Sequence, residues 1–216
     1  MRVVVFGATG GTGRAVTDRA IAAGHSVTAF ARNAHRIAPT AGLTVIEGDA
    51  MVAAQVAPAL VGQDAIVIAL GNSQNAFALL FGARRTTPKD ICEVGTRNIL
   101  GAVGEGSNIP VRIVGAFGTG DTRANLPALF KLFYRLFLAE QMADKERQIS
   151  VLKASDTRHM LIQPVALTAK AATGTWTISR DGSFGKSEVS RADLAAFIVQ
   201  SLTDPDARGG TITFSG

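Results

Sequence analysis

The sequence predicts an α/β protein built on one Rossmann-like, doubly wound parallel sheet with helices on both faces. Short apolar, β-branched runs alternate with helical patterns along the chain, which is typical of a parallel sheet covered on both faces. A glycine-rich turn, residues 7–13, joins the first apolar run to the first helical pattern. The length of 216 residues suits one domain with a large core, so we expect residues 1–216 to form a single domain.

The N-terminal half contains four apolar runs of strand length and three helical patterns. The runs are rich in valine, isoleucine, leucine and phenylalanine, which favour strands. In chain order we expect strand Val3–Phe6, helix Gly13–Ala23, strands Ser26–Ala31 and Thr44–Glu47, helix Ala53–Leu60, strand Ala65–Leu70 and helix Pro88–Gly104.

The C-terminal half continues the alternation with shorter elements. The expected order is strand Val111–Ala116, helix Pro127–Ala154 broken once, strand His159–Gln163, short strand Thr175–Ser179, helix Arg191–Leu202 and short strand Thr211–Phe214. Two helix starts carry local capping patterns. Thr87 precedes a proline and has Asp90 three residues later, and Ser190 with Asp193 repeats that spacing.

The stretch Leu126–Met142 is apolar around most of a helix surface. Lys131, Arg135 and Glu140 leave only a narrow polar stripe, so such a helix should be buried on more than one side. Three interpretations stay open: packing in the core, a lid over an apolar ligand, and a homodimer contact.

Composition excludes several classes of protein. A hydrophobic fraction of 47% with 18% charged residues excludes a disordered chain. No apolar run predicts a membrane span, and the short N-terminal run leads into the glycine-rich turn, unlike a secretory signal. The single cysteine, Cys92, cannot form an internal disulfide. We therefore expect a cytoplasmic location and a core role for Cys92 rather than a nucleophilic one.

Charge and histidine placement argue against nucleic acid and metal. The net charge is +5, but Arg and Lys are scattered and do not alternate with aromatic residues. A phosphorylated small ligand accounts for part of this charge more simply. The spacing of His25, His35 and His159 shows no metal cluster, so we assign no metal site.

The glycine-rich turn predicts a site for a dinucleotide. A strand that delivers Gly-x-x-Gly-x-x-Gly onto a helix start places free amides and the positive end of the helix dipole against a diphosphate. The alternative is a glycine-rich turn without a ligand. The predicted binding residues here are Gly7, Thr9, Gly10, Gly11, Thr12 and Gly13.

The end of the second strand favours NADP(H) over NAD(H). An acidic residue there usually holds the adenosine ribose when NAD is bound, but this chain has Arg32 and, one helical turn later, Arg36. Guanidinium groups suit the additional 2′-phosphate of NADP. The alternative is two solvated surface arginines.

Later strand ends should lie along the same ligand, because ligands bind outside the carboxyl ends of parallel strands. Asp49 follows the third strand and is a candidate for the adenine amino group or, alternatively, for a helix cap. The remaining candidates at the ends of the third, fourth and fifth strands are Ala50, Leu70, Gly71, Asn72, Gly115, Ala116 and Phe117.

Several motifs occur together in one order over nearly the whole chain. They are Phe6–Gly13, Ala31–Asn33, Glu47–Asp49, Gly62–Val67, Gly95–Ile99, Asp144–Glu146, Val151–Ser155 and Gln163–Pro164. With them the chain resembles the atypical short-chain dehydrogenase/reductases, in particular their NAD(P)H-binding, NmrA-like group, and within it the biliverdin-IXβ reductase (flavin reductase) family.

This resemblance implies hydride delivery from NADP(H) to a flat, conjugated acceptor. It also implies cofactor contacts at the end of the sixth strand, Pro164 and Val165, and a substrate side formed by residues from about 117 to 190. The chain departs from the family where a serine is replaced by Gly115 and a histidine by Val165. The Tyr-x-x-x-Lys pair of ordinary short-chain dehydrogenases is also absent, because Leu138 stands four residues after Tyr134.

These departures favour some acceptors over others. Ketone reduction needs a proton donor for the alkoxide, whereas a flavin or quinone spreads the charge and takes its proton from water. Lys145 is the candidate catalytic or cofactor-orienting residue; the alternative is a solvated lysine on a charged helix face. We therefore predict an NADPH-dependent reductase of flavins, quinones or similar acceptors. The alternative is a dinucleotide sensor of NmrA type without turnover, while action on nucleotide sugars is disfavoured.

Overall fold

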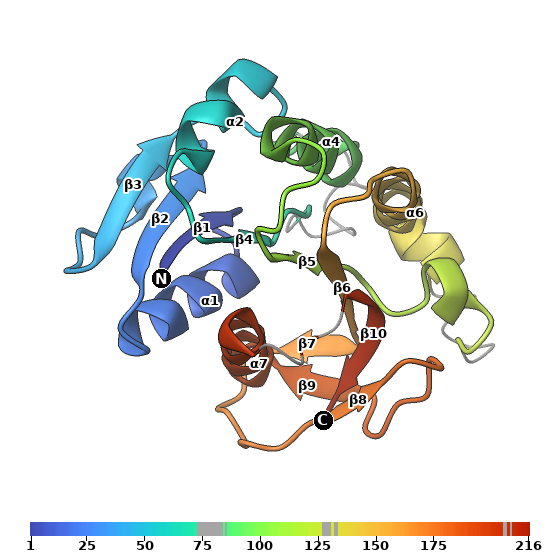
Figure 1. The fold of residues 1–216 in the computed structure, drawn as a ribbon. Coiled ribbons are helices and arrows are strands. Elements are labelled where there is room, and N and C mark those ends of the chain that lie inside the picture. The colour runs from blue at the N-terminus through green and yellow to red at the C-terminus, as the bar shows by residue number, and fades with distance from the viewer. Residues whose placement is uncertain (73–83, 85, 127–130, 132–133, 205–206, 208) are drawn as a thin grey trace.

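The computed structural model describes residues 1–72, 84, 86–126, 131, 134–204, 207 and 209–216. Within them an eight-stranded sheet has the order β3-β2-β1-β4-β5-β6-β10-β8 (Figure 1). Its strands are β1 (Arg2–Phe6), β2 (Ser26–Ala31), β3 (Leu43–Glu47), β4 (Ala65–Ile68), β5 (Val111–Val114), β6 (His159–Pro164), β8 (Thr177–Ser179) and β10 (Gly210–Ser215).

All strand pairs of this sheet are parallel except β8 with β10. The chain builds outward from β1 to β3, and then returns to place β4 on the other side of β1. A crevice forms where the strand order reverses in this way. The predicted doubly wound parallel sheet is confirmed, and the reversal puts the carboxyl ends of β1 and β4 at the centre of the molecule.

Helices cover both faces of the sheet. They are α1 (Gly11–Ala22), α2 (Ala53–Leu60), α4 (Ile91–Val103), α6 (Ala139–Lys153) and α7 (Arg191–Thr203). Short turns add η1 (Ala34–Arg36), η2 (Gly120–Arg123) and a π-helix, η3 (Tyr134–Leu138). In Figure 1, α1 and α7 lie on one face, and α2, α4 and α6 lie on the other.

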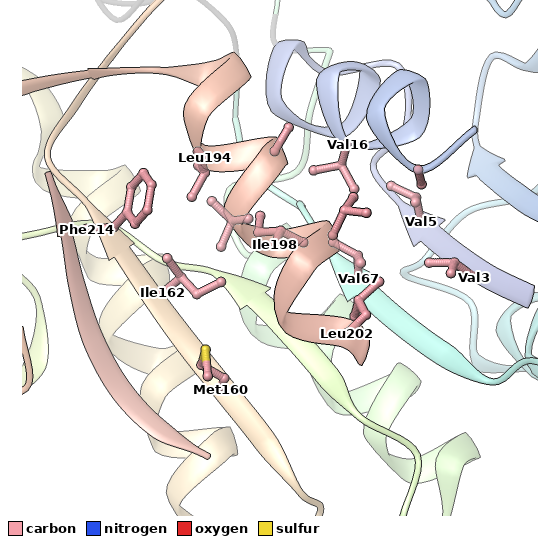
Figure 2. Close-up of a cluster of buried hydrophobic side chains, with 14 of the residues drawn as sticks. Val3, Val5, Val16, Val67, Met160, Ile162, Leu194, Ile198, Leu202 and Phe214 are labelled. Carbon is pink, nitrogen blue, oxygen red and sulfur yellow. The ribbon is translucent and has the colours of Figure 1, made fainter. Parts of the chain in front are cut away.

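Alternate residues of each strand supply two separate cores, because successive side chains of a strand point to opposite faces. Val3 and Val5 of β1 pack with α1 and α7, as Figure 2 shows for Val16, Leu194 and Ile198. The intervening residues of β1 pack with α2, α4 and α6. Because both faces of β1 are buried, its side chains form a continuous apolar run rather than an alternating one.

The strands β4 and β5 end two residues earlier than predicted, at Ile68 and Val114 rather than at Leu70 and Ala116. Beyond these ends, the amides of Ala69 and Gly115 still donate to Phe6 and Ile162 of the neighbouring strands, while the carbonyl oxygens of Leu70 and Val114 accept hydrogen bonds from the Lys145 side chain. A side chain from another element, α6, therefore joins the two strand ends.

The start of α4 also differs from the prediction. The helix begins at Ile91 with Asp90 as its N-cap residue, so the predicted N-cap at Thr87 is wrong. The first-turn amides of Cys92 and Glu93 donate instead to the Asp144 carboxylate, which lies on α6. A cap supplied by another helix explains why no local capping bond is made.

The second capping prediction is confirmed. The hydroxyl of Ser190 accepts from the Asp193 amide at 2.9 Å and donates to the Asp193 carboxylate at 2.8 Å. A small parallel sheet missed by the prediction ends here: β9 (Glu188–Ser190) pairs with β7 (Ala166–Thr168). Strands of three residues are too short to show a period in the sequence.

The stretch Leu126–Met142 is not one regular helix. Leu126 is buried in the core of the α1 and α7 face, while Leu136, in the π-helix, is exposed. Residues 127–130 and 132–133 of the predicted helix, including its start at Pro127, lie outside the described residues. Across the part of the chain that the structure describes, no helix is both long and apolar enough to cross a bilayer.

Candidate functional site

The glycine-rich turn connects β1 to α1 in a conformation that only glycine allows. Gly7 has φ +84°, and a Cβ there would lie 2.6 Å from the Ala69 oxygen. A Cβ on Gly13 would lie 2.2 Å from the Gly7 oxygen, so this residue lets the helix pack against its own turn. Glycine at both positions brings the backbone of the turn close to the end of β4.

The first turn of α1 is open to an anion. Gly10 is the N-cap residue and makes no side-chain cap, and the first turn contains no acidic side chain. The first amides of a helix have no partner within the helix, and the positive end of the helix dipole faces the same space. This arrangement suits a phosphate group.

A cavity of about 270 Å³ lies in front of this turn, at the carboxyl ends of the parallel strands. Thirteen of the predicted residues line it, drawn from six separate parts of the chain. They are Gly7, Thr9, Gly10, Gly11, Thr12, Arg32, Asp49, Ala50, Leu70, Gly71, Asn72, Gly115 and Lys145.

Six predicted residues do not line this cavity. Gly13 is buried behind the turn, and Arg36 is exposed in η1. Ala116 lines a neighbouring cavity instead. Phe117 and Val165 are buried in the core, and the Phe117 amide donates to the Pro164 oxygen, so these three residues lie in backbone ladders.

Arg32 is held in place at the mouth of the cavity. Its guanidinium donates to the Thr86 oxygen at 3.1 Å and to the Thr87 hydroxyl at 3.3 Å, in the segment that precedes α4. Thr87 itself lines the cavity. The predicted N-cap threonine therefore contributes to the site by fixing an arginine rather than by starting a helix.

Asp49 makes a local turn rather than a helix cap. Its carboxylate accepts from the Met51 amide at 3.0 Å, whereas the N-cap residue of α2 is Val52. The alternative interpretation of Asp49 as the cap of that helix is wrong. Asp49 itself lines the cavity, beyond the end of β3.

Lys145 is buried, so the interpretation as a solvated lysine is wrong. Its ammonium group donates to the Leu70 oxygen at 3.0 Å, to the Val114 oxygen at 2.7 Å and to Gln148 Oε1 at 3.1 Å. An ammonium group has three protons to donate, and these three acceptors use all of them. Lys145 thus ties the ends of β4 and β5 together at the floor of the cavity.

A second cavity of about 300 Å³ adjoins the first. The two share Gly71, Asn72 and Lys145, and the second extends towards the start of α6, where Leu138 and Met142 line it. Among the described lining residues of both cavities there is no tyrosine, serine or histidine.

Cys92 also lines the second cavity, but it is not a nucleophile at neutral pH. Burial raises the pKa of its thiol to about 11, although the nearby Lys145 acts in the opposite direction. The sulfur lies 3.4 Å from the Leu70 oxygen. A protonated, buried thiol agrees with the predicted core role.

Tyr134 lies away from both cavities. It lines a separate pocket with Arg123 and Arg135, beside Gly118, and burial raises its pKa. Within the described residues no group of histidine, cysteine and carboxylate side chains forms a metal site.

The sequence interpretation missed nine residues of the first cavity. Most are strand-end neighbours of predicted residues and were not singled out because their side chains carry no ligand chemistry. They are Phe30, Ala31, Asn33, Gly48, Ala69, Thr87, Ile91, Val114 and Arg191. Arg191 is different, because it reaches the cavity from α7, and nothing in the local sequence indicates that approach.

Comparison with known proteins extends this picture. The model of a family described as NAD(P)H-binding matches residues 7–205. Among solved structures the chain is similar to ChuY, an anaerobillin reductase from Escherichia coli O157:H7, with 23% identity and a TM-score of 0.79 over 100% of this chain and 97% of that chain.

Two further structures show the same fold. SP1627, a putative NADH-flavin reductase from Streptococcus pneumoniae TIGR4, has 18% identity and a TM-score of 0.74 over 99% of this chain and 98% of that chain. A wide-type short-chain dehydrogenase/reductase from Veillonella parvula DSM 2008, in complex with NADP, has 17% identity and a TM-score of 0.72 over 100% and 94% of the two chains.

Proposed function

Because the chain belongs to the NAD(P)H-binding family, we propose that it is an NADPH-dependent oxidoreductase that transfers a hydride to a flavin, a quinone or a similar conjugated acceptor. The observation that carries this proposal is the pair of adjoining cavities at the carboxyl ends of β4 and β5. One suits a dinucleotide, and the other offers space beside it for an acceptor.

In this proposal the glycine-rich turn holds the diphosphate of the cofactor. The turn fits this group, because the first amides of α1 have no partner within the helix and its first turn contains no acidic side chain. Arg32, with Arg36 beyond it, takes the 2′-phosphate, and Asp49 lies on the adenine side. Gly71, Asn72 and Gly115 line the path towards the nicotinamide, with Ala116, Phe117, Pro164 and Val165 behind it.

When bound, NADPH supplies the hydride. The acceptor lies in the second cavity, between Lys145 and the start of α6, in a single domain whose residues from about 117 to 190 form the substrate side. Two electrons and one proton pass to the acceptor with the hydride, and water supplies the second proton. A delocalised acceptor needs no positioned acid, which agrees with the absence of tyrosine, serine and histidine among the described lining residues.

Lys145 acts in this scheme as a positioning residue. Its three hydrogen bonds hold the ends of β4 and β5 at a set separation, and its positive charge lies where negative charge develops on an accepting ring. The names of two similar structures, an anaerobillin reductase and a putative NADH-flavin reductase, support a conjugated acceptor. A third similar structure holds NADP and supports that cofactor.

The second candidate function is a dinucleotide sensor without turnover. The same absence of tyrosine, serine and histidine among the described lining residues favours it. The apolar stretch Leu126–Met142 would then contact a partner protein, whereas in a reductase it would form a lid or a homodimer contact. A cytoplasmic location, where NADPH is abundant, suits either function.

The test is NADPH oxidation with riboflavin, flavin mononucleotide and small quinones as acceptors. We expect turnover with at least one of them, and we expect Arg32→Glu to lose NADPH-dependent turnover while it keeps activity with NADH. Tight binding of NADPH without turnover on any acceptor would favour the sensor. A wild-type preference for NADH would contradict the role given to Arg32.

A further inference from the structure

Arg191 meets the glycine-rich turn from the opposite end of the chain. It is the first residue of α7 and lines the same cavity as Gly10 and Gly11. A Cβ placed on Gly11 would lie 3.2 Å from Arg191 Nε and 3.3 Å from its Cδ. The guanidinium end of this side chain therefore rests against the turn, at the position where α1 begins.

The start of α7 is held firmly. The Ser190 hydroxyl caps the helix through two hydrogen bonds with Asp193, and the Asp193 carboxylate also accepts from the amides of Thr173 and Gly174 at 3.0 and 2.9 Å. Further along, α7 packs against α1 through the core that contains Val16 and Leu194 (Figure 2). The fold thus fixes Arg191 opposite the amides of α1.

The charge of Arg191 has no partner in the described part of the chain. No carboxylate or carbonyl oxygen of the described residues forms an ion pair or hydrogen bond with it. The turn opposite it presents amide donors and the positive end of the α1 dipole. Two positive groups that face each other across a cavity are stabilised when an anion lies between them.

We propose that Arg191 binds the diphosphate of the dinucleotide, on the side opposite to the amides of the glycine-rich turn. This inference rests on the proposed function, since it takes the same cofactor in the same cavity. The diphosphate is common to NADPH and NADH, so Arg191 adds affinity for both without choosing between them. Arg32, at the other end of the cavity, is the residue that selects NADPH over NADH.

The experiment measures dissociation constants of NADPH and NADH for the wild type, Arg191→Ala and Arg32→Ala, without any acceptor. We expect Arg191→Ala to weaken both dinucleotides by a similar factor, about tenfold to hundredfold, as for a lost charge-assisted hydrogen bond. Arg32→Ala should weaken NADPH alone. Arg191→Lys, which keeps the charge but loses the planar fork, should fall between Arg191→Ala and the wild type.

Two smaller probes separate binding from a general structural effect. Competition with adenosine diphosphate should weaken in Arg191→Ala, whereas competition with adenosine 2′-monophosphate, which lacks the diphosphate, should be unchanged. Arg14→Ala is the matched control, because Arg14 is exposed on the first turns of α1 and does not line the cavity; both dinucleotides should bind it as they bind the wild type.

Unchanged affinity for both dinucleotides in Arg191→Ala would overturn the inference, as would a loss confined to NADPH or an equal loss of both small probes. These outcomes would not contradict the proposed reductase activity, because that activity is measured separately by turnover. Failure of the wild type to bind either dinucleotide would overturn both proposals.

Discussion

Lys145 shows how a single buried side chain organises the site. Its ammonium group holds the carbonyl oxygens of Leu70 and Val114 and the side chain of Gln148. Gln148 in turn donates to the Thr96 hydroxyl at 2.8 Å. Because every proton of the ammonium group is already donated, Lys145 serves the cavity as a fixed positive charge and a strand tie.

Replacing Lys145 should therefore reduce the stability of the protein first, and affect hydride transfer only as a consequence. In Lys145→Met the buried acceptors lose their donor, and we expect the free energy of unfolding to fall by about 3 kcal/mol. Urea denaturation measures this loss. Lys153→Met is the control, since Lys153 is an exposed residue of the same helix, and it should change stability by less than about 0.5 kcal/mol. Equal losses of stability in Lys145→Met and Lys153→Met would contradict the proposal that Lys145 holds the ends of β4 and β5 together.

Two helical glycines differ in whether the structure leaves space for a side chain. A Cβ on Gly13 would lie 2.2 Å from a backbone oxygen, whereas a Cβ on Gly101 of α4 meets nothing within 4 Å. We expect Gly13→Ala to destabilise the protein by about 2 kcal/mol and to abolish dinucleotide binding. Gly101→Ala should stabilise it by about 0.5 kcal/mol, because alanine favours a helix. Thermal unfolding and nucleotide titration compare the two, and a neutral Gly13→Ala would refute the close packing of the turn.

At the scale of elements, local pattern predicted most of the fold. The apolar run of β2 and the helical pattern of α2 predicted these two elements with the bounds that the structure has. For β2 the reason is that burial on both faces of the sheet leaves a continuous apolar run. The start of α4 was not predictable in this way, since its capping carboxylate, Asp144, is on α6. A cap that comes from more than fifty residues away has no local signature.

Because the cap comes from another helix, we expect substitution of Asp144 to destabilise the protein more than substitution of the N-cap residue Asp90. Asp144→Ala should lower the free energy of unfolding by about 1 to 2 kcal/mol, because the amides of Cys92 and Glu93 lose their acceptor. Asp90→Ala, at the N-cap position itself, should have an effect of less than about 0.5 kcal/mol, because its side chain makes no capping bond. Chemical denaturation measures the loss of stability in both variants. A larger loss in Asp90→Ala than in Asp144→Ala would place the cap on Asp90.

The part of the candidate site that could be predicted from the sequence is the part formed by a single β–α unit, β1 with α1. Gly7 and residues 9–12 line the cavity because the turn and the helix start are adjacent in the sequence. Arg191 was missed because 180 residues separate it from Gly11, and only the packing of α7 on α1 brings the two together. The three-residue strands β7 and β9, which lead to Arg191, were missed for the same lack of local signal.

At the scale of the whole molecule, several carboxylates have lowered pKa values. The Arg97 side chain lowers the pKa of Glu93 most, burial opposes it, and Arg147 lowers the pKa further. Burial raises the pKa of Asp193, but hydrogen bonds from Thr173, Ser190 and Gly174 outweigh it and lower the pKa overall. The Arg2 side chain lowers the pKa of Asp64. Folding therefore favours the charged form of each of these groups.

Stability should fall in acid for this reason. The unfolded chain binds protons on these carboxylates near pH 4, above the pKa values of the folded state, so their contribution is complete above about pH 5 and is lost as the pH falls below about 4. Urea denaturation between pH 7 and pH 3 measures the decline. Asp193→Asn should make it shallower, and an unchanged slope in that variant would argue against a lowered Asp193 pKa.

Every role proposed for the site requires a dinucleotide in the first cavity, and a crystal structure with NADPH tests that most directly. We expect the diphosphate between the amides of residues 10–12 and the guanidinium of Arg191, the 2′-phosphate at Arg32, and the nicotinamide above Gly115 and Lys145. Density for the nucleotide outside this cavity, or a diphosphate that contacts neither the glycine-rich turn nor Arg191, would contradict it.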